Sequence, residues 1–501
     1  MRLDPVLLVV TPLISAFLLS LVKKLTPRLA PSLALGLSVF TLVLSTLLAK
    51  EVYINGPVAS YLGGWNPRIG ISLLADQASV LLVLLVSWGQ TLGLVFIASY
   101  RGFTHWPGKY LVFSSIFTCS LIGMALTADL FNLFVFIELS TVATIGIMAK
   151  PDRPLGSVAG FVYLIVASVS GSLLLIGVVL VYSATGSLSM AVIAQEIHAL
   201  PPGLYWGILL CFTLSMGMKF GLVPMHFWQP WAYHAAGCTG AALLTAFGMK
   251  AYLFAFFRVL WVPLQLPSMA PVFFPVLTLW GLANIILGHT MGLIQKDYKK
   301  LLALSSTAHG GYILVAAGLA GSMGTTTAGL FALAAGFFHM LNHSLVKASL
   351  LWVGRSFLKQ ASSSTIDVLK ASPLGTGIFV LAALGIVGIP PTGGFASKLF
   401  IASSAGTPAP VIIIGLGTLI SLAYYLRIYL ILRDQTSTPS IVKSNGTSVR
   451  ELNSLFVPGI LAMGVLFIGF SSSIIMPVLL NGAGAMMDSG TYILHVLGDL
   501  P

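Results

Sequence analysis

Five ionisable residues lie inside strongly apolar stretches of the sequence, where charged side chains are seldom found. They are one glutamate and four lysines: Glu138, Lys219, Lys250, Lys347 and Lys398. An ionised side chain at the centre of a membrane helix costs about 2.5–3.5 kcal/mol, so each charge needs an opposite charge, bound water or a change of protonation. A buried lysine whose partner moves closer or further away changes its affinity for protons. A proton relay requires this property.

Histidines accompany these charges at helical spacing. His339, His343 and Lys347 recur every four residues, which places them on one face of a helix. His309 shares a face of a second apolar stretch with Ser305. Because histidine titrates near neutral pH and can pass a proton between its two ring nitrogens, we interpret this stripe as part of a relay.

Structural explanations remain open for several of these charges. Lys347 is close enough to the end of its stretch that its side chain can extend to the membrane surface. Glu138, Lys219 and Lys250 can form ion pairs that only hold helices together. For Arg258 and Arg427, which lie near helix ends, we favour such a structural role.

Helix-breaking residues stand beside two of the lysines. Pro224 follows Lys219 by five positions, and Pro390 and Pro391 precede Lys398. Proline removes a backbone donor and clashes with the preceding turn. Unwound backbone at membrane depth is tolerated only inside protein or beside water, and it typically marks ion sites of transporters.

The composition excludes a water-soluble globule. Of 501 residues, 57% are hydrophobic and 8% charged, and the mean hydropathy is +0.98. Apolar stretches of about twenty residues predict membrane-spanning helices, because each helical residue rises 1.5 Å and the hydrocarbon core is about 30 Å thick. We expect an all-α membrane protein with about fourteen spans, at 5–22, 30–49, 71–98, 110–127, 130–149, 157–182, 204–228, 238–260, 271–289, 301–320, 326–354, 373–405, 408–432 and 455–477.

The net charge of +12 follows the predicted topology. Most basic residues fall in loops after odd-numbered spans, so the positive-inside rule predicts that these loops face the cytoplasm and that both termini lie outside. We therefore expect a multi-pass protein in the plasma membrane of a prokaryote, in contact with lipid and without a nucleic-acid partner. The first span is predicted to be a retained helix rather than a signal peptide.

The sequence offers no motif for a redox centre or a metal site. Its three cysteines, Cys119, Cys211 and Cys238, lie in or beside spans without CxxC spacing and are interpreted as buried apolar side chains. A phosphate loop and a dinucleotide-binding glycine motif are also absent from the sequence. We expect no metal and no cofactor in this chain.

The positions of the two breaks predict an internal repeat. They fall in the seventh and twelfth spans, five apart, so spans 4–8 and 9–13 would form two five-helix units of opposite orientation. We expect four segments: N-terminal helices at 1–109, the two repeats at 110–260 and 271–432, and a polar loop, last span and tail at 433–501.

Several motifs together resemble a known family. LTADLFNLFVFIELS, MKFGLVPMHFWQPWAY, LIQKDYKKLLALSSTAHGGY, HMLNHSLVKASL and GIVGIPPTGGFASK are similar to the antiporter-like subunits of Mrp-type sodium/proton antiporters, respiratory complex I and membrane-bound energy-converting hydrogenases. The resemblance covers roughly residues 70 to 430. The segment YLGGWNPRIGISLLADQASVLLVLL looks most like the D-type member of the Mrp antiporters.

The resemblance implies a role for each buried charge. Glu138 matches the fifth-helix glutamate of the family, which pairs with the lysine of the broken seventh helix, here Lys219. The relay would continue through the central residues in the order Lys250, His309, His339, His343, Lys347 and Lys398. Some members carry a glutamate in place of Lys398, and the lysine argues against that branch. The lack of a long sequence after the last span argues against the largest complex I member and the A-type member of the Mrp antiporters.

The function implied is a proton-translocating subunit of a larger membrane complex, whose partner subunits supply cation antiport or redox chemistry. Protons would be its substrates, and sodium ions are a second candidate. Two alternatives stay open: a stand-alone secondary transporter, and a structural subunit whose buried charges only hold helices together. Transport by this chain alone would support the first, and transport that survives loss of the charges would support the second.

Overall fold

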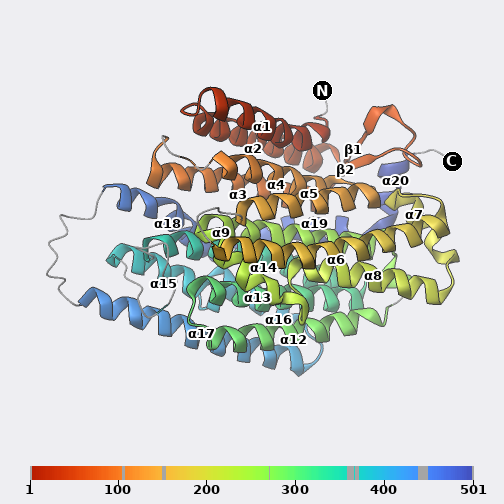
Figure 1. The fold of residues 1–501 in the computed structure, drawn as a ribbon. Coiled ribbons are helices and arrows are strands. Elements are labelled where there is room, and N and C mark those ends of the chain that lie inside the picture. The colour runs from red at the N-terminus through yellow and green to blue at the C-terminus, as the bar shows by residue number, and fades with distance from the viewer. Residues whose placement is uncertain are drawn as a thin grey trace.

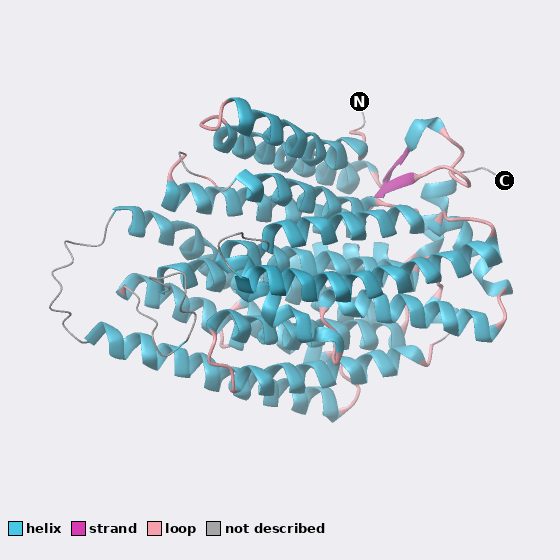
Figure 2. Ribbon diagram, in the orientation of Figure 1, coloured by secondary structure: helices cyan, strands magenta, loops and turns pink. Residues whose placement is uncertain are grey.

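The protein is a multi-pass helical membrane protein. The computed structural model describes residues 3–103, 106, 108–148, 154–269, 271–357, 366, 372–437 and 449–498. Within these residues, twelve helical stretches are long and apolar enough to cross a membrane. The helices run side by side along one direction, and a two-stranded hairpin lies at the end of the bundle near the C-terminus (Figure 1 and Figure 2).

The first half of the chain contains the first break and the two strands. Its helices and strands are α1 (Val6–Leu25), α2 (Ala30–Asn55), β1 (Val58–Tyr61), β2 (Ser72–Ala75), α3 (Gln77–Arg101), α4 (Gly108–Leu126), α5 (Leu130–Met148), α6 (Pro154–Thr185), α7 (Met190–Glu196), α8 (Pro202–Phe220), α9 (Gln229–Ala242) and α10 (Met249–Trp261).

The second half contains the second break and the long central helix α13. Its helices are α11 (Leu266–Met269), α12 (Phe273–Leu293), α13 (Tyr298–Met323), α14 (Thr327–Phe357), α15 (Pro373–Val387), α16 (Gly393–Ser403), α17 (Pro408–Ser437), α18 (Val449–Phe470), α19 (Ser472–Met487) and α20 (Ser489–Leu497). Every residue of the most apolar window of α13 is buried, so this helix lies at the centre of the bundle.

The predicted third span begins too early. Residues Ser72–Ala75 pair as an antiparallel strand with Val58–Tyr61, and the helix starts after Asp76. The Asp76 carboxylate accepts from the Ser79 backbone N–H (2.8 Å), while the Ser79 hydroxyl accepts from the Asp76 N–H (2.8 Å). This capping box fixes the start of α3, so the preceding residues pair as a strand instead.

The 60-residue apolar segment Pro202–Trp261 contains two spans, as the sequence predicts. The Tyr205 hydroxyl near its start donates to the carbonyl of Leu264 just beyond its end (2.8 Å). A straight helix of 60 residues would be about 90 Å long, so the chain reverses inside the segment. Gly237, at φ 72° and ψ 176°, leaves helical geometry there.

Both predicted helix breaks are present. α8 ends at Phe220 and α15 at Val387, and each is followed by a glycine in the left-handed conformation, Gly221 or Gly388. A proline stands three residues after each glycine, and the peptide bonds before Pro224 and Pro391 are both cis. The inverted repeat that the breaks suggest remains a prediction.

The predicted last span and tail differ from the structure. α18 ends at Phe470, and the chain continues through Ser471 into α19, where the Ile475 N–H donates to the Ser471 carbonyl (3.0 Å). Residues predicted as tail are therefore helical. They pack inside the bundle because α19 is apolar and its Gly482 allows a close approach to Leu81 of α3.

Candidate functional site

The predicted glutamate and lysine lie beside each other on neighbouring helices. Glu138 of α5 and Lys219 of α8 are 4.0 Å apart between Oε1 and Nζ, and Lys219 also donates to the Thr141 hydroxyl (2.6 Å). The lysine side chain is 1% exposed and the glutamate side chain 36%. The Glu138–Lys219 pair therefore reaches from the interior to the outer face of the bundle.

Outside the spans, Asp129 caps α5, and burial raises its pKa to about 6.

The carboxylate occupies a space that a glycine leaves open. Glu138 Oε1 has no hydrogen-bond partner within the described residues. A Cβ atom added at Gly171 of α6 would lie only 2.5 Å from this oxygen. The small residue thus lets the carboxylate rest against α6 within reach of Lys219.

Tyrosine hydroxyls extend the polar region from the pair toward α10. The Tyr163 ring centre lies 5.8 Å from the Lys219 ammonium, and the Tyr252 hydroxyl lies 2.7 Å from the Ser140 hydroxyl. Tyr252 is two residues from Lys250, so the two side chains do not share a helix face. Among the described residues, no hydrogen bond joins Tyr252 to Lys250, and the pair and the central residues form separate hydrogen-bonded groups.

Lys250 lies at the junction between α10 and α14. A π-helical segment, Leu243–Gly248, precedes α10, and such segments leave backbone carbonyls available to other donors. The Lys250 ammonium donates to the Thr245 carbonyl (2.7 Å) and hydrogen-bonds with Nδ1 of His343. Lys250 and His343 are both fully buried.

Three histidines continue from Lys250 in the bundle centre. The rings of His343 and His309 lie 5.1 Å apart. His309 Nδ1 and His339 Nε2 are 2.9 Å apart, and His339 Nδ1 lies 2.9 Å from the Ser397 hydroxyl. The Nε2 atoms of His309 and His343 have no partner within the described residues, so the series has a gap between these two rings.

Lys398 ends the series at the second helix break. Its ammonium donates to the Val387 carbonyl (2.9 Å) and to the Thr418 hydroxyl (3.1 Å), and it lies 4.9 Å from the centre of the Tyr312 ring. Ser397, which contacts His339, is its neighbour in the chain. We define the central file as Lys250, His343, His309, His339, Ser397 and Lys398.

Lys347 is buried inside the bundle. It is 0% exposed, and its ammonium donates to the Leu302 carbonyl of α13 (2.8 Å). It lies one helical turn from His343 on α14. This position differs from that of a lysine whose ammonium extends to the membrane surface.

A fourth central histidine, His289, is absent from the relay that the sequence predicts. Its ring lies 5.6 Å from that of His309, and its nitrogens contact the hydroxyls of Tyr424 (3.1 Å) and Tyr312 (3.2 Å). It stood at the last position of the predicted ninth span, where a polar residue is unremarkable. Because α12 continues to Leu293, His289 lies within the helix.

The two arginines expected to be structural have structural contacts. Arg258 forms a buried ion pair with Asp76 (2.7 Å), and this pair ties α10 to the start of α3. Arg427 donates to the carbonyls of Leu293 and Gln295 at the end of α12 (2.9 and 2.6 Å). Neither arginine contacts the central file.

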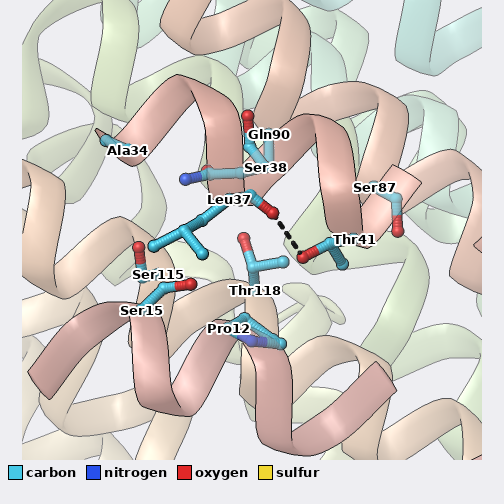
Figure 3. A pocket seen from close by; sticks show the side chains of 10 residues that line it. All are labelled: Pro12, Ser15, Ala34, Leu37, Ser38, Thr41, Ser87, Gln90, Ser115 and Thr118. Carbon is cyan, nitrogen blue, oxygen red and sulfur yellow. Dashed lines mark hydrogen bonds between the residues drawn. The ribbon is translucent and has the colours of Figure 1, made fainter. Parts of the chain in front are cut away.

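A polar cavity lies apart from the file, between α1, α2, α3 and α4 (Figure 3). Its hydroxyls largely donate to carbonyls of their own helices, as Thr41 does to Leu37 (2.9 Å) and Thr118 to Ser114 (3.0 Å). It shares no residue with the central file. Within the described part of the chain, no three His, Cys, Asp or Glu residues gather as a metal site would require.

Known proteins share both the sequence and the fold. Residues 127–423 match the family model described as NADH:quinone oxidoreductase/Mrp antiporter, TM. NADH-quinone oxidoreductase subunit N of Desulforudis audaxviator is 30% identical over 85% of each chain, and the D-type subunit of the Na(+)/H(+) antiporter of Alkalihalophilus pseudofirmus is 28% identical over 91% of this chain and 92% of its own. A chain of an archaeal membrane-bound sulfane sulfur reductase superposes with a TM-score of 0.86 at 26% identity, covering 98% of this chain and 99% of its own.

The match spans more than half of the chain and includes both helix breaks, the Glu138–Lys219 pair and the whole central file. The chain is therefore an antiporter-like membrane subunit and belongs to the NADH:quinone oxidoreductase/Mrp antiporter transmembrane family.

Proposed function

We propose that this chain carries protons across the membrane as one subunit of a multisubunit complex, with Glu138, Lys219 and the central file as its path. The observation that supports this most directly is the central file itself, a series of buried lysines and histidines with one serine that extends from Lys250 to Lys398. Buried ionisable groups in membrane helices typically belong to ion or proton paths.

The histidines suit stepwise transfer. A neutral imidazole accepts a proton on one nitrogen and releases one from the other. His339 contacts His309 through Nε2 and Ser397 through Nδ1, so a proton accepted on one side of its ring can leave on the other. A water molecule between His343 and His309 would satisfy both unpartnered Nε2 atoms and close the gap.

The Glu138–Lys219 pair is suited to control this path. While the carboxylate stays near Lys219, it favours the charged lysine. If a neighbouring charge draws Glu138 away, the field of Lys219 acts more strongly on the other buried cations, including Lys250. Charge movement at the pair then changes proton affinity along the file without a hydrogen bond between the two groups.

The exposure of Glu138 supports a partner subunit at that face. A glutamate whose side chain is 36% exposed at membrane depth would be costly against lipid, whereas another protein subunit can cover it. The relatives named above are themselves called subunits. We propose that partner subunits supply the driving force, through sodium antiport or redox chemistry, in the plasma membrane of a prokaryote with both termini outside.

The test compares Lys250→Met with Lys50→Met in the purified complex reconstituted into vesicles. Lys50 is an exposed lysine of α2, so the same chemical change there serves as a control. An imposed membrane potential drives flux, and a pH-sensitive dye reports it. We expect Lys250→Met to reduce proton flux at least tenfold with normal assembly and Lys50→Met to leave flux unchanged.

The alternatives predict different results. Wild-type flux in an assembled Lys250→Met complex would favour a structural subunit and contradict the proposal. Gradient-driven transport of an organic solute by this chain alone would favour a stand-alone secondary transporter.

A further inference from the structure

A second titratable pair lies where α13 begins. His234 of α9 and Asp297, the residue before α13, are 2.7 Å apart between Nδ1 and Oδ2. Their side chains are 24% and 17% exposed, so water reaches both. The other oxygen, Oδ1, caps α13 by accepting the Lys300 N–H (2.9 Å). One carboxylate thus fixes the start of the central helix and pairs with a histidine.

Tyr298 leads from this pair into the bundle. It follows Asp297 in the chain and is fully buried, and its hydroxyl donates to the Leu350 carbonyl of α14 (2.7 Å). Gly354 makes room for the ring, because a Cβ there would lie 2.5 Å from Tyr298 Cε1. The phenol therefore lies along α14 and points away from the start of α13 toward the interior.

Lys347 lies at the inner end of this route. It is three residues before Leu350 on α14, and its ammonium contacts the Leu302 carbonyl, five residues or roughly 8 Å of helix beyond Asp297. His343 of the central file is one turn further along α14. Surface pair, phenol, lysine and file thus follow one another along α13 and α14.

We propose that His234 and Asp297 form a port for protons from water on the side of the membrane that carries the basic loops. Through this port the protons reach the central file, with Lys347 as the group that receives them. A hydronium ion protonates the pair, the proton passes through water and the Tyr298 hydroxyl, and neutral Lys347 becomes an ammonium. Basic residues lie around the port: Lys296 precedes Asp297 in the chain, the Lys299 ammonium donates to the His234 carbonyl (3.0 Å), and the Lys300 N–H donates to Asp297. This inference rests on the proposed proton transport.

The Asp297→Asn variant tests the role of the carboxylate in proton transfer while the cap of α13 is kept. Asparagine is as good a helix cap as aspartate, so α13 keeps its start while the port loses its carboxylate. In vesicles of known orientation, we expect proton flux to fall about five- to twentyfold. Formate added on the basic side alone should restore much of it, because a small acid can deliver protons in place of the missing group. His234→Gln should also slow flux, whereas His198→Gln, the same change at an exposed histidine, should not.

The result that overturns the port is wild-type flux in both Asp297→Asn and His234→Gln while Lys250→Met stops transport. Loss of flux that formate does not restore also overturns it, because the pair would then be only structural. Retained flux in Lys250→Met would instead contradict the proposed function, so the two failures are distinguishable.

Discussion

The two helix breaks have the same backbone plan but hold their lysines differently. In each, a membrane helix ends at a left-handed glycine, Gly221 (φ 84°, ψ 46°) or Gly388 (φ 86°, ψ 51°), and a proline follows three residues later. Glycine is required because a Cβ atom makes this conformation unfavourable. The lysines occupy opposite sides: Lys219 precedes its break, and Lys398 follows its own.

Different donors close the two helix ends. At the first break, the Trp228 indole donates to the Met218 carbonyl (2.8 Å), and the Gln229 amide donates to the Phe220 carbonyl (3.0 Å). Neutral side chains thus satisfy the end of α8 and leave Lys219 free to face Thr141 and Glu138. At the second break, Lys398 itself donates to the last carbonyl of α15, that of Val387 (2.9 Å).

This difference gives Lys219 a partner whose charge can change and Lys398 a partner whose partial charge is fixed. The carbonyl end of α15 carries partial negative charge that favours the ammonium form of Lys398 and cannot be titrated away. Lys219 depends on Glu138, a carboxylate that can take up a proton or turn toward a neighbour. We infer that external control acts at the first break and that the second provides a constant end point.

Removing the lysine of the first break should have the largest effect. Lys219→Met leaves Glu138 without its cation, and we expect proton flux to fall more than twentyfold and the thermal midpoint of the complex to drop. The double variant with Glu138→Gln should regain most of the midpoint but none of the flux, because it removes the uncompensated charge and not the relay defect. Full flux in the double variant would refute the inference that external control acts at the first break.

At the second break, Lys398→Arg should impair proton release while keeping the helix end closed. Arginine donates to carbonyls but does not deprotonate in proteins. We expect about a tenfold loss of flux and a thermal midpoint close to that of the wild type. Lys50→Arg, at an exposed site of α2, is the matched control. Normal flux in Lys398→Arg would place Lys398 outside the path.

The sequence predicted the breaks well because proline and glycine act locally. Hydropathy likewise placed most of the spans, since length and composition determine membrane crossing. The contacts across helices were not predictable in the same way. Nothing in the local sequence of His289 indicates that its ring lies beside His309, and nothing near Lys398 indicates that it closes α15. Such contacts depend on how helices that are far apart in the chain pack together.

Loss of an uncharged donor that satisfies the end of α8 should affect stability more than transport. Gln229→Ala removes the donor to the Phe220 carbonyl and the acceptor of the Thr307 hydroxyl (2.8 Å). Leaving a buried polar group unpaired costs about 1–3 kcal/mol. We expect a lower thermal midpoint and at most a threefold loss of flux. A loss as large as that of Lys219→Met would mean that Gln229 belongs to the path.

The smallest effect should come from crowding Glu138 without changing any charge. In Gly171→Ala, the new methyl group would meet Oε1 at 2.5 Å, so the flexible glutamate must turn away from Lys219. The cost in stability should be small because the end of a side chain moves and the backbone does not. We expect roughly a twofold loss of flux, and none for Gly160→Ala on the same helix, where a Cβ meets nothing within 4 Å. Equal flux in both variants would show that the distance from Glu138 to Lys219 does not limit transport, and the first break would then be as fixed as the second.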